Sequence, residues 1–137
     1  MNDRDILIIK NSWSYLINQS DEVGLLFYNK LFELDPGLKS MFHNDMDGQI
    51  QKFMDLITFT VTRLQKITDI ENELDALAMR HLTYGVRPQH YQLMGKALLW
   101  AFEKSLGDLW NEETNNAWRE LYNFLALSMM RSAGPNL

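Results

Sequence analysis

The chain has 137 residues, no cysteine and a formal net charge of −5, and 46% of its residues are hydrophobic. This length and hydrophobic content suit one domain with a sizeable core. The acidic balance argues against nucleic acid or an anionic membrane as a partner. Because cysteine is absent, disulfides, thiolate metal sites and thiol nucleophiles are excluded.

The N-terminal stretch MNDRDILIIK carries acidic residues where a secretory signal would be basic. No apolar run approaches the roughly 18 residues that a membrane-spanning helix needs. We therefore expect a cytoplasmic protein with no membrane segment.

Apolar residues recur at helical spacing through nearly the whole chain, and no stretch alternates with the period of two that a strand requires. The pattern predicts an all-α fold. The first helix begins at Asp3, and residues 19–21 end it and cap the next helix, which carries LLFYNKLFEL. The apolar face of the first helix is formed by Ile6, Ile9, Trp13, Leu16 and Ile17.

The middle of the chain predicts a short helix, a loop and two longer helices. Pro36 is tolerated at a helix start, so the short helix is expected from there to Phe42, followed by the polar loop HNDMDG. A long helix is predicted from Gln49 to Lys66. Residues 68–71 are typical of a capped start, and the helix that follows should end near residues 84–85.

The C-terminal third predicts two further helices. One starts at Arg87 and Pro88 and runs through Leu106, and the other extends from Asn111 to Arg131 before Gly134-Pro135 stops it. Seven helices result. We expect one domain over residues 1–132 and a flexible tail over residues 133–137.

Three histidines are present, in different contexts. His43 lies in the polar loop and His90 opens a helix. His81 lies on the apolar face of its predicted helix, because Leu77 and Ala78 precede it by four and three residues. Periodicity alone leaves two interpretations open for His81: a core histidine bonded to a backbone carbonyl, or a ligand.

Two further polar side chains occur in apolar surroundings. Tyr28 lies among large apolar residues of the second helix, and Gln49 heads an apolar stripe that continues with Phe53 and Ile57. Taken singly, Tyr28 is typical of a core residue and Gln49 of a solvent-facing one.

The segments LLFYNKLFELDPGLKSMF, QIQKFM and MRHLTYGVRPQHY resemble bacterial single-domain haemoglobins and the globin part of flavohaemoglobins. Animal neuroglobin is more distantly similar. The resemblance runs in order from about Ile6 to Met130. It implies a globin fold around a b-type haem, with His81 as the proximal iron ligand. Because the chain has no cysteine, the haem would be held non-covalently.

The resemblance also implies roles for residues around the haem. Tyr28 and Gln49 match distal positions, where a hydroxyl and an amide stabilise negative charge on bound oxygen. Carbon monoxide and nitric oxide are the other expected ligands. The cofactor-lining positions are matched by Phe42, Phe53, Ile57, Leu77, Val86, Tyr91 and Leu98.

The chain departs from these families at several positions. Flavohaemoglobins support the proximal histidine with a tyrosine and a glutamate; Tyr91 is present, but the glutamate position aligns with Ala133, which argues against peroxidase-like chemistry. Gln49 stands where neuroglobin-like proteins have a histidine, so a permanently six-coordinate iron is not expected. His43 could swing toward the iron, although polar loops usually place such a side chain in solvent.

We therefore expect reversible oxygen binding, storage or transport by a monomer or weak homodimer. One alternative is a nitric oxide dioxygenase with a separate reductase, because the chain has no flavin or nicotinamide fingerprint. Another is the gas-sensing module of a longer protein. A helical bundle without haem that binds protein partners is the remaining alternative.

Overall fold

A computed structural model of the chain describes residues 1–42, 45–66, 71–83 and 86–132. These residues form no strand and confirm the all-α prediction. The α-helices are α1 (Asp3–Leu16), α2 (Ser20–Leu34), α3 (Met46–Thr62), α4 (Glu71–Thr83), α5 (Pro88–Leu106) and α6 (Glu112–Ser132). In the part of the chain described, no helix has the length and apolar character needed to cross a bilayer.

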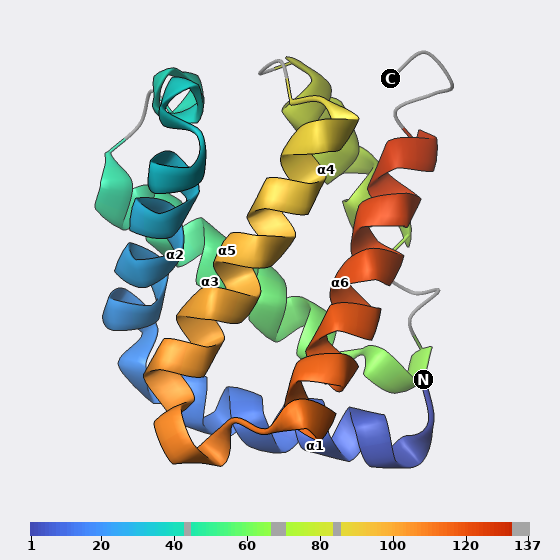
Figure 1. Ribbon diagram of the computed structural model, residues 1–137. Coiled ribbons are helices and arrows are strands. Elements are labelled where there is room, and N and C mark those ends of the chain that lie inside the picture. Colours follow the sequence, from blue (N-terminus) through green and yellow to red (C-terminus); the bar gives the residue numbers. More distant parts are fainter. Residues whose placement is uncertain (43–44, 67–70, 84–85, 133–137) are drawn as a thin grey trace.

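The helices pack as a crossed bundle. Helix α2 contacts α3 and α5, while α6 contacts α1, α4 and α5. Figure 1 shows α1 across the base, with α5 and α6 running side by side in opposite directions. Helix α3 passes behind α5 in the same view. This arrangement brings α2, α3, α4 and α5, which carry most of the predicted site residues, into one bundle.

The short helix predicted after Asp35 is a 3₁₀ helix, η2 (Pro36–Met41), so six of the seven expected helices are α-helical. Asp35 sets its start, because the carboxylate oxygen Oδ1 accepts a hydrogen bond of 3.1 Å from the backbone N–H of Gly37. The predicted tail and the ends expected near residues 84–85 and 134–135 lie outside the described residues.

The predicted boundaries of the helix expected from Gln49 to Lys66 are wrong at both ends. Helix α3 begins at Met46, inside the expected loop, and ends at Thr62 rather than Lys66. The early start has a physical cause: Asp45 Oδ1 accepts a 2.7 Å hydrogen bond from the N–H of Gly48 and so caps the helix. The helix therefore begins at Met46, three residues before Gln49. The 3₁₀ turn over residues 64–66 replaces the last predicted turn.

An aromatic cluster joins α1, α5 and α6 at the base of the bundle. The ring centroids of Trp13 and Phe102 are 5.9 Å apart, and those of Phe102 and Trp118 are 4.8 Å apart. The buried indole N–H of Trp118 donates a 2.8 Å hydrogen bond to Ser12 Oγ. Tilted and edge-on contacts of this kind add to the free energy gained from burial of the rings.

Helices α2 and α3 pack closely against each other at Gly24. A Cβ atom built on Gly24 would lie 2.9 Å from Ile50 Cγ1, and it would approach Ile50 Cγ2 more closely still. Only glycine therefore allows the two backbones to lie at this separation.

We expect Gly24→Ala to lower the free energy of unfolding by about 1 to 3 kcal/mol, because the added methyl group overpacks the crossing. Unfolding in urea, followed by circular dichroism, measures the change. Ile50→Ala is the matched control: since it removes the two Ile50 atoms nearest to the new methyl group and leaves only Cβ at 3.1 Å, the double variant should be more stable than the sum of the single effects implies. Strict additivity would contradict the predicted clash.

Candidate functional site

His81 lies in the last turn of α4 and meets Tyr91 in the first turn of α5. The ring nitrogen Nδ1 of His81 is 3.2 Å from the Tyr91 hydroxyl oxygen, and the ring centroids are 5.9 Å apart. Tyr91 is buried, whereas the His81 side chain is partly exposed. Because Nδ1 is engaged by the hydroxyl, Nε2 is the ring nitrogen that could coordinate a metal.

The surroundings of His81 favour its neutral form. Burial lowers the pKa of His81 to about 4, and the neighbouring positive charge of Arg80 contributes a smaller decrease. A neutral imidazole is the form that coordinates iron or another transition metal. His81 is therefore neutral near pH 7, which is the form in which an imidazole could bind a metal.

Tyr122 of α6 fixes the backbone that carries Tyr91. The Tyr122 hydroxyl donates a 2.6 Å hydrogen bond to the Tyr91 carbonyl oxygen, and burial raises the pKa of Tyr122. The ring fits there because residue 95 is glycine: a Cβ on Gly95 would lie 2.8 Å from Tyr122 Cε2. Sequence reasoning missed Tyr122, although its helical register with Trp118 indicates an inward-facing position.

A second cluster surrounds Tyr28, which projects from α2. Its ring lies edge-on to Phe42 and Phe53, at centroid distances of 5.4 and 6.1 Å. Phe27 stacks on Phe53 at 4.5 Å. These contacts bring α2, α3 and the residue that follows η2 together around one buried hydroxyl group.

Tyr28 and Gln49, which were predicted to act together, are neighbours in the structure. The Tyr28 hydroxyl donates a hydrogen bond of 3.5 Å to the backbone carbonyl oxygen of Gln49, not to its side chain. Burial raises the pKa of Tyr28 to about 12, and the contact with Gln49 reduces that increase. Tyr28 therefore keeps its proton and remains a hydrogen-bond donor at neutral pH.

The other predicted cofactor-lining residues fall into two groups. One group belongs to the buried core and comprises Ile57, Val86 and Leu98. The other group, made of large apolar side chains that pack on the core but stay partly exposed, comprises Phe42, Phe53 and Leu77. No contact recorded among the described residues joins the Tyr28 cluster directly to His81.

The remaining predicted residues lie elsewhere. His43 and Ala133 are outside the described residues. His90 accepts a 2.8 Å hydrogen bond at Nδ1 from the backbone N–H of Arg87, and its Nε2 lies 4.0 Å from Asp35 Oδ2. His90 thus has a structural role at the start of α5. Within the described ranges, no three His, Asp or Glu side chains gather as a metal site.

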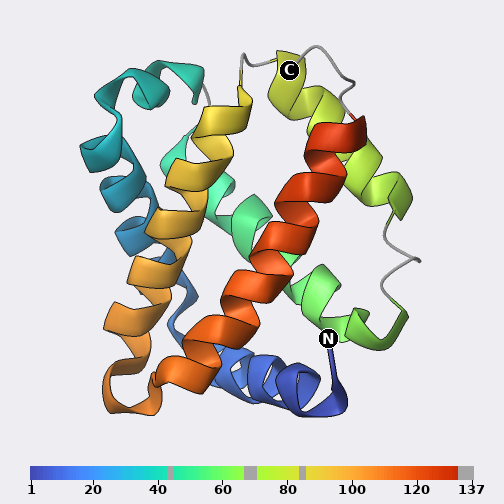
Figure 2. The ribbon, with the colours of Figure 1, turned by 45° about the vertical axis from the view of Figure 1, so that its right-hand side comes forward.

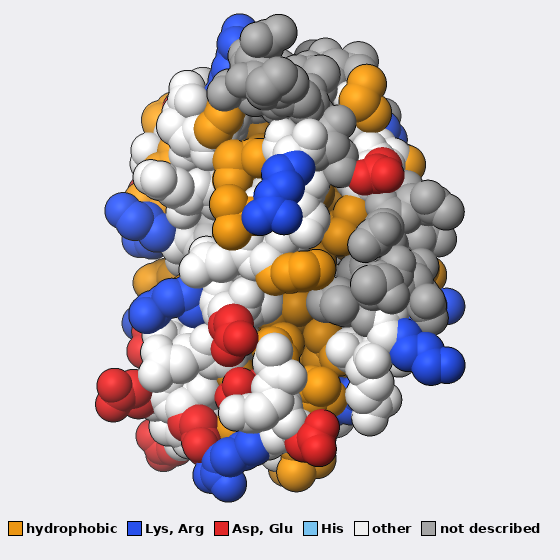
Figure 3. Space-filling view, turned by 90° about the vertical axis from the view of Figure 1, so that its right-hand side faces the viewer, with side chains coloured by type: hydrophobic (Ala, Val, Ile, Leu, Met, Phe, Trp, Pro, Cys, Tyr) orange, Lys and Arg blue, Asp and Glu red, His pale blue; other side chains and the backbone are white. Residues whose placement is uncertain are grey.

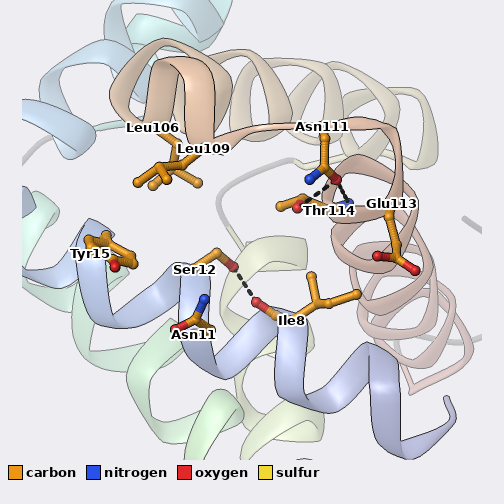
Figure 4. Close-up of a pocket in the computed structure, with 9 residues that line it drawn as sticks. All are labelled: Ile8, Asn11, Ser12, Tyr15, Leu106, Leu109, Asn111, Glu113 and Thr114. Carbon is orange, nitrogen blue, oxygen red and sulfur yellow. Dashed lines mark hydrogen bonds between the residues drawn. The ribbon is translucent and has the colours of Figure 1, made fainter.

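A cavity of about 200 Å³ lies between α1 and the α5–α6 corner, away from both clusters. Figure 4 shows its lining, in which Ser12 Oγ donates to the Ile8 carbonyl oxygen at 2.8 Å. The side-chain oxygen Oδ1 of Asn111 accepts hydrogen bonds from the backbone N–H and the hydroxyl of Thr114, at 2.9 and 3.0 Å. These polar groups form hydrogen bonds within a helix or at its start. None of the predicted site residues lines the cavity.

Comparison with known proteins gives consistent results. The Globin family matches residues 25–129. Neuroglobin of Tetraodon nigroviridis is 27% identical, with 99% of this chain and 94% of that protein covered. An uncharacterized globin-like protein of Aquifex aeolicus is 28% identical, with 95% and 92% covered. An anaerobic nitrite reductase of Gossypium hirsutum is also 28% identical, with 93% and 86% covered.

Two solved structures share the fold. A bacterial globin from Campylobacter jejuni superimposes with a TM-score of 0.84 at 24% identity, covering 96% of each chain. The second is an engineered carbene transferase from a candidate nitric oxide dioxygenase of Rhodothermus marinus. It superimposes with a TM-score of 0.85 at 24% identity, and the match covers 97% of this chain and 94% of that one. The chain therefore belongs to the globin family, whose members bind haem and, through it, small gaseous ligands.

Proposed function

We propose that the chain binds haem non-covalently through His81 and holds oxygen, carbon monoxide or nitric oxide on the side lined by Tyr28 and Gln49. The observation that carries the proposal is the contact of 3.2 Å between His81 Nδ1 and the Tyr91 hydroxyl. It engages one ring nitrogen of a neutral imidazole and leaves the other for iron. Reversible binding of oxygen, for storage or transport, is the function this arrangement supports best.

The apolar residues fit a flat hydrophobic cofactor. Phe42, Phe53 and Leu77 are large and apolar yet only partly buried, although the core beside them is closely packed. A haem between α3 and α4 would cover these side chains and gain the free energy of burying their exposed surface. Buried residues such as Ile57 and Leu98 would form the wall behind it.

His81 would hold the iron of a bound haem, and the iron would supply the site at which a diatomic gas binds. On the proximal side, the contact between His81 Nδ1 and the Tyr91 hydroxyl orients the imidazole ring, and with Nε2 bound to iron Nδ1 would carry the proton and donate it to the hydroxyl oxygen. Tyr122 holds the Tyr91 backbone in place. Tyr91 and Tyr122 together would hold the ring so that Nε2 stays available to the cofactor.

On the distal side, Tyr28 provides a protonated donor in surroundings from which water is largely excluded. Its hydrogen bond of 3.5 Å to the backbone carbonyl oxygen of Gln49 is long and therefore weak. Turning the hydroxyl toward a ligand would thus cost little free energy. The Gln49 amide can supply a second donor. Two donors in a dry cavity retain a polar ligand such as oxygen and slow its release.

His81→Gly tests the proposal directly. We expect haem affinity to fall at least about tenfold, because the axial bond is lost, and added imidazole should restore it partly by filling the space. Haem titration followed by the Soret band measures affinity, and carbon monoxide difference spectra report the open position. His90→Gly is the matched control and should bind haem normally. Unchanged haem uptake and gas titration in His81→Gly would refute the proposal.

Tyr28→Phe tests the distal role, because it removes one hydroxyl and keeps the aromatic packing with Phe42 and Phe53. The rate of oxygen dissociation should rise about tenfold or more, which corresponds to the loss of one buried hydrogen bond. The rate of carbon monoxide dissociation, measured as control, should change less because carbon monoxide carries little charge. Stopped-flow replacement of oxygen by carbon monoxide gives the first rate; an unchanged value would exclude Tyr28 from this role.

The contact of Tyr91 with His81 also favours a second candidate, a nitric oxide dioxygenase that receives electrons from a separate reductase. An acceptor for the Nδ1 proton makes the imidazole a stronger electron donor. One solved structure of the same fold is described as derived from a candidate enzyme of this class.

The two candidates differ in turnover. When the oxygenated protein is mixed with nitric oxide and a reductase, a dioxygenase should form nitrate over many cycles, and Tyr91→Phe should slow this about tenfold while carbon monoxide binding is preserved. A storage protein should complete a single cycle. Nitrate assay with stopped-flow detection of each cycle decides between them.

A further inference from the structure

The outer face of α6 carries a short stripe of exposed residues that follows helical spacing. Glu120, Phe124, Leu127 and Arg131 are separated by four, three and four residues, so they share one face of the helix. Figure 2 brings α6 to the front of the molecule, and Figure 3 looks onto this side, where hydrophobic side chains lie between charged ones. We refer to these four residues as the α6 stripe.

Each member of the α6 stripe is exposed. The side chains of Phe124 and Leu127 are 40% and 49% exposed, although both are large and apolar. The Glu120 side chain is 54% exposed and lies 3.6 Å from the N-terminal amine, and Arg131 is exposed in the last turn of the helix. Two adjacent apolar side chains in water are thus flanked by an acid on one side and a base on the other.

The order of residues along the stripe makes it complementary to itself. If a second copy of α6 lies antiparallel, with the twofold axis between Leu125 and Ala126, Glu120 faces Arg131 of the second copy and Phe124 faces its Leu127. Twofold symmetry repeats both contacts, so two ion pairs enclose two apolar contacts. A parallel arrangement would place like charges together, which is unfavourable.

We propose that the α6 stripe is the contact surface of a weak homodimer of this chain, with the two α6 helices antiparallel. The argument for a second copy as the occupant is charge complementarity: the stripe has one charge of each sign and no net charge, within a chain of net charge −5. This inference does not depend on the proposed function.

The small size of the stripe limits the strength of the dimer. A contact centred on two apolar residues per copy buries less surface area than the roughly 1,200 Å² that is typical of stable complexes. Association should therefore be detectable only at high protein concentration, and high salt should weaken it further because the ion pairs are exposed.

Charge reversal tests the proposal on the full, haem-loaded chain. In sedimentation equilibrium from about 10 μM to about 1 mM, the unaltered protein should show reversible dimerisation. Arg131→Glu and Glu120→Arg should each weaken association at least about tenfold, because each places like charges together twice. The double variant that exchanges both charges should recover dimerisation. Phe124→Ser should weaken association without changing any charge.

The control is Glu103→Arg, which changes the net charge as Glu120→Arg does but lies at an exposed position of α5. It should leave association unchanged. Because Glu120 also neighbours the N-terminal amine, circular dichroism checks the folding of each variant, and Arg131→Glu gives a reversal that leaves this contact intact. A protein that stays monomeric at every concentration, a dimer that survives the reversals, or a double exchange that fails to restore it would each overturn the proposal.

Discussion

The contact between His81 and Tyr91 is the interaction on which the rest of the site depends. It joins the last turn of α4 to the first turn of α5 through a ring nitrogen and a hydroxyl 3.2 Å apart. Tyr122, from α6, holds the Tyr91 backbone, and Gly95 leaves room for its ring. Three helices thus determine the orientation of one imidazole, which local sequence around His81 could not achieve alone.

Helices could be predicted from the sequence more accurately than the contacts between side chains. Apolar periodicity identified six α-helices and the short helix after Asp35, because helical spacing reports directly which face is buried. The start of α3 was missed because a cap depends on one hydrogen bond from Asp45, which periodicity does not detect. Tyr122 was missed for a related reason: its inward position is predictable, but its bond to a carbonyl of another helix is not.

In the candidate site, too, the positions of residues were easier to predict than their contacts. Tyr28 and Gln49 were predicted to be distal residues of the site; they lie next to each other, and the Tyr28 hydroxyl bonds to the main chain of Gln49. A side chain can be assigned to a face from spacing alone, whereas the atom it contacts depends on how two helices cross. The partial exposure of Phe42, Phe53 and Leu77 is likewise a property of the packed bundle.

The crossing at Gly24 has a consequence for the position of Tyr28. Tyr28 lies one helical turn after Gly24, and Gln49 is the residue before Ile50, whose side chain meets that glycine. The backbone separation of the two helices there therefore sets how far the Tyr28 hydroxyl lies from the main-chain carbonyl of Gln49. A hydrogen atom in place of a methyl group thus helps to fix the position of the Tyr28 hydroxyl.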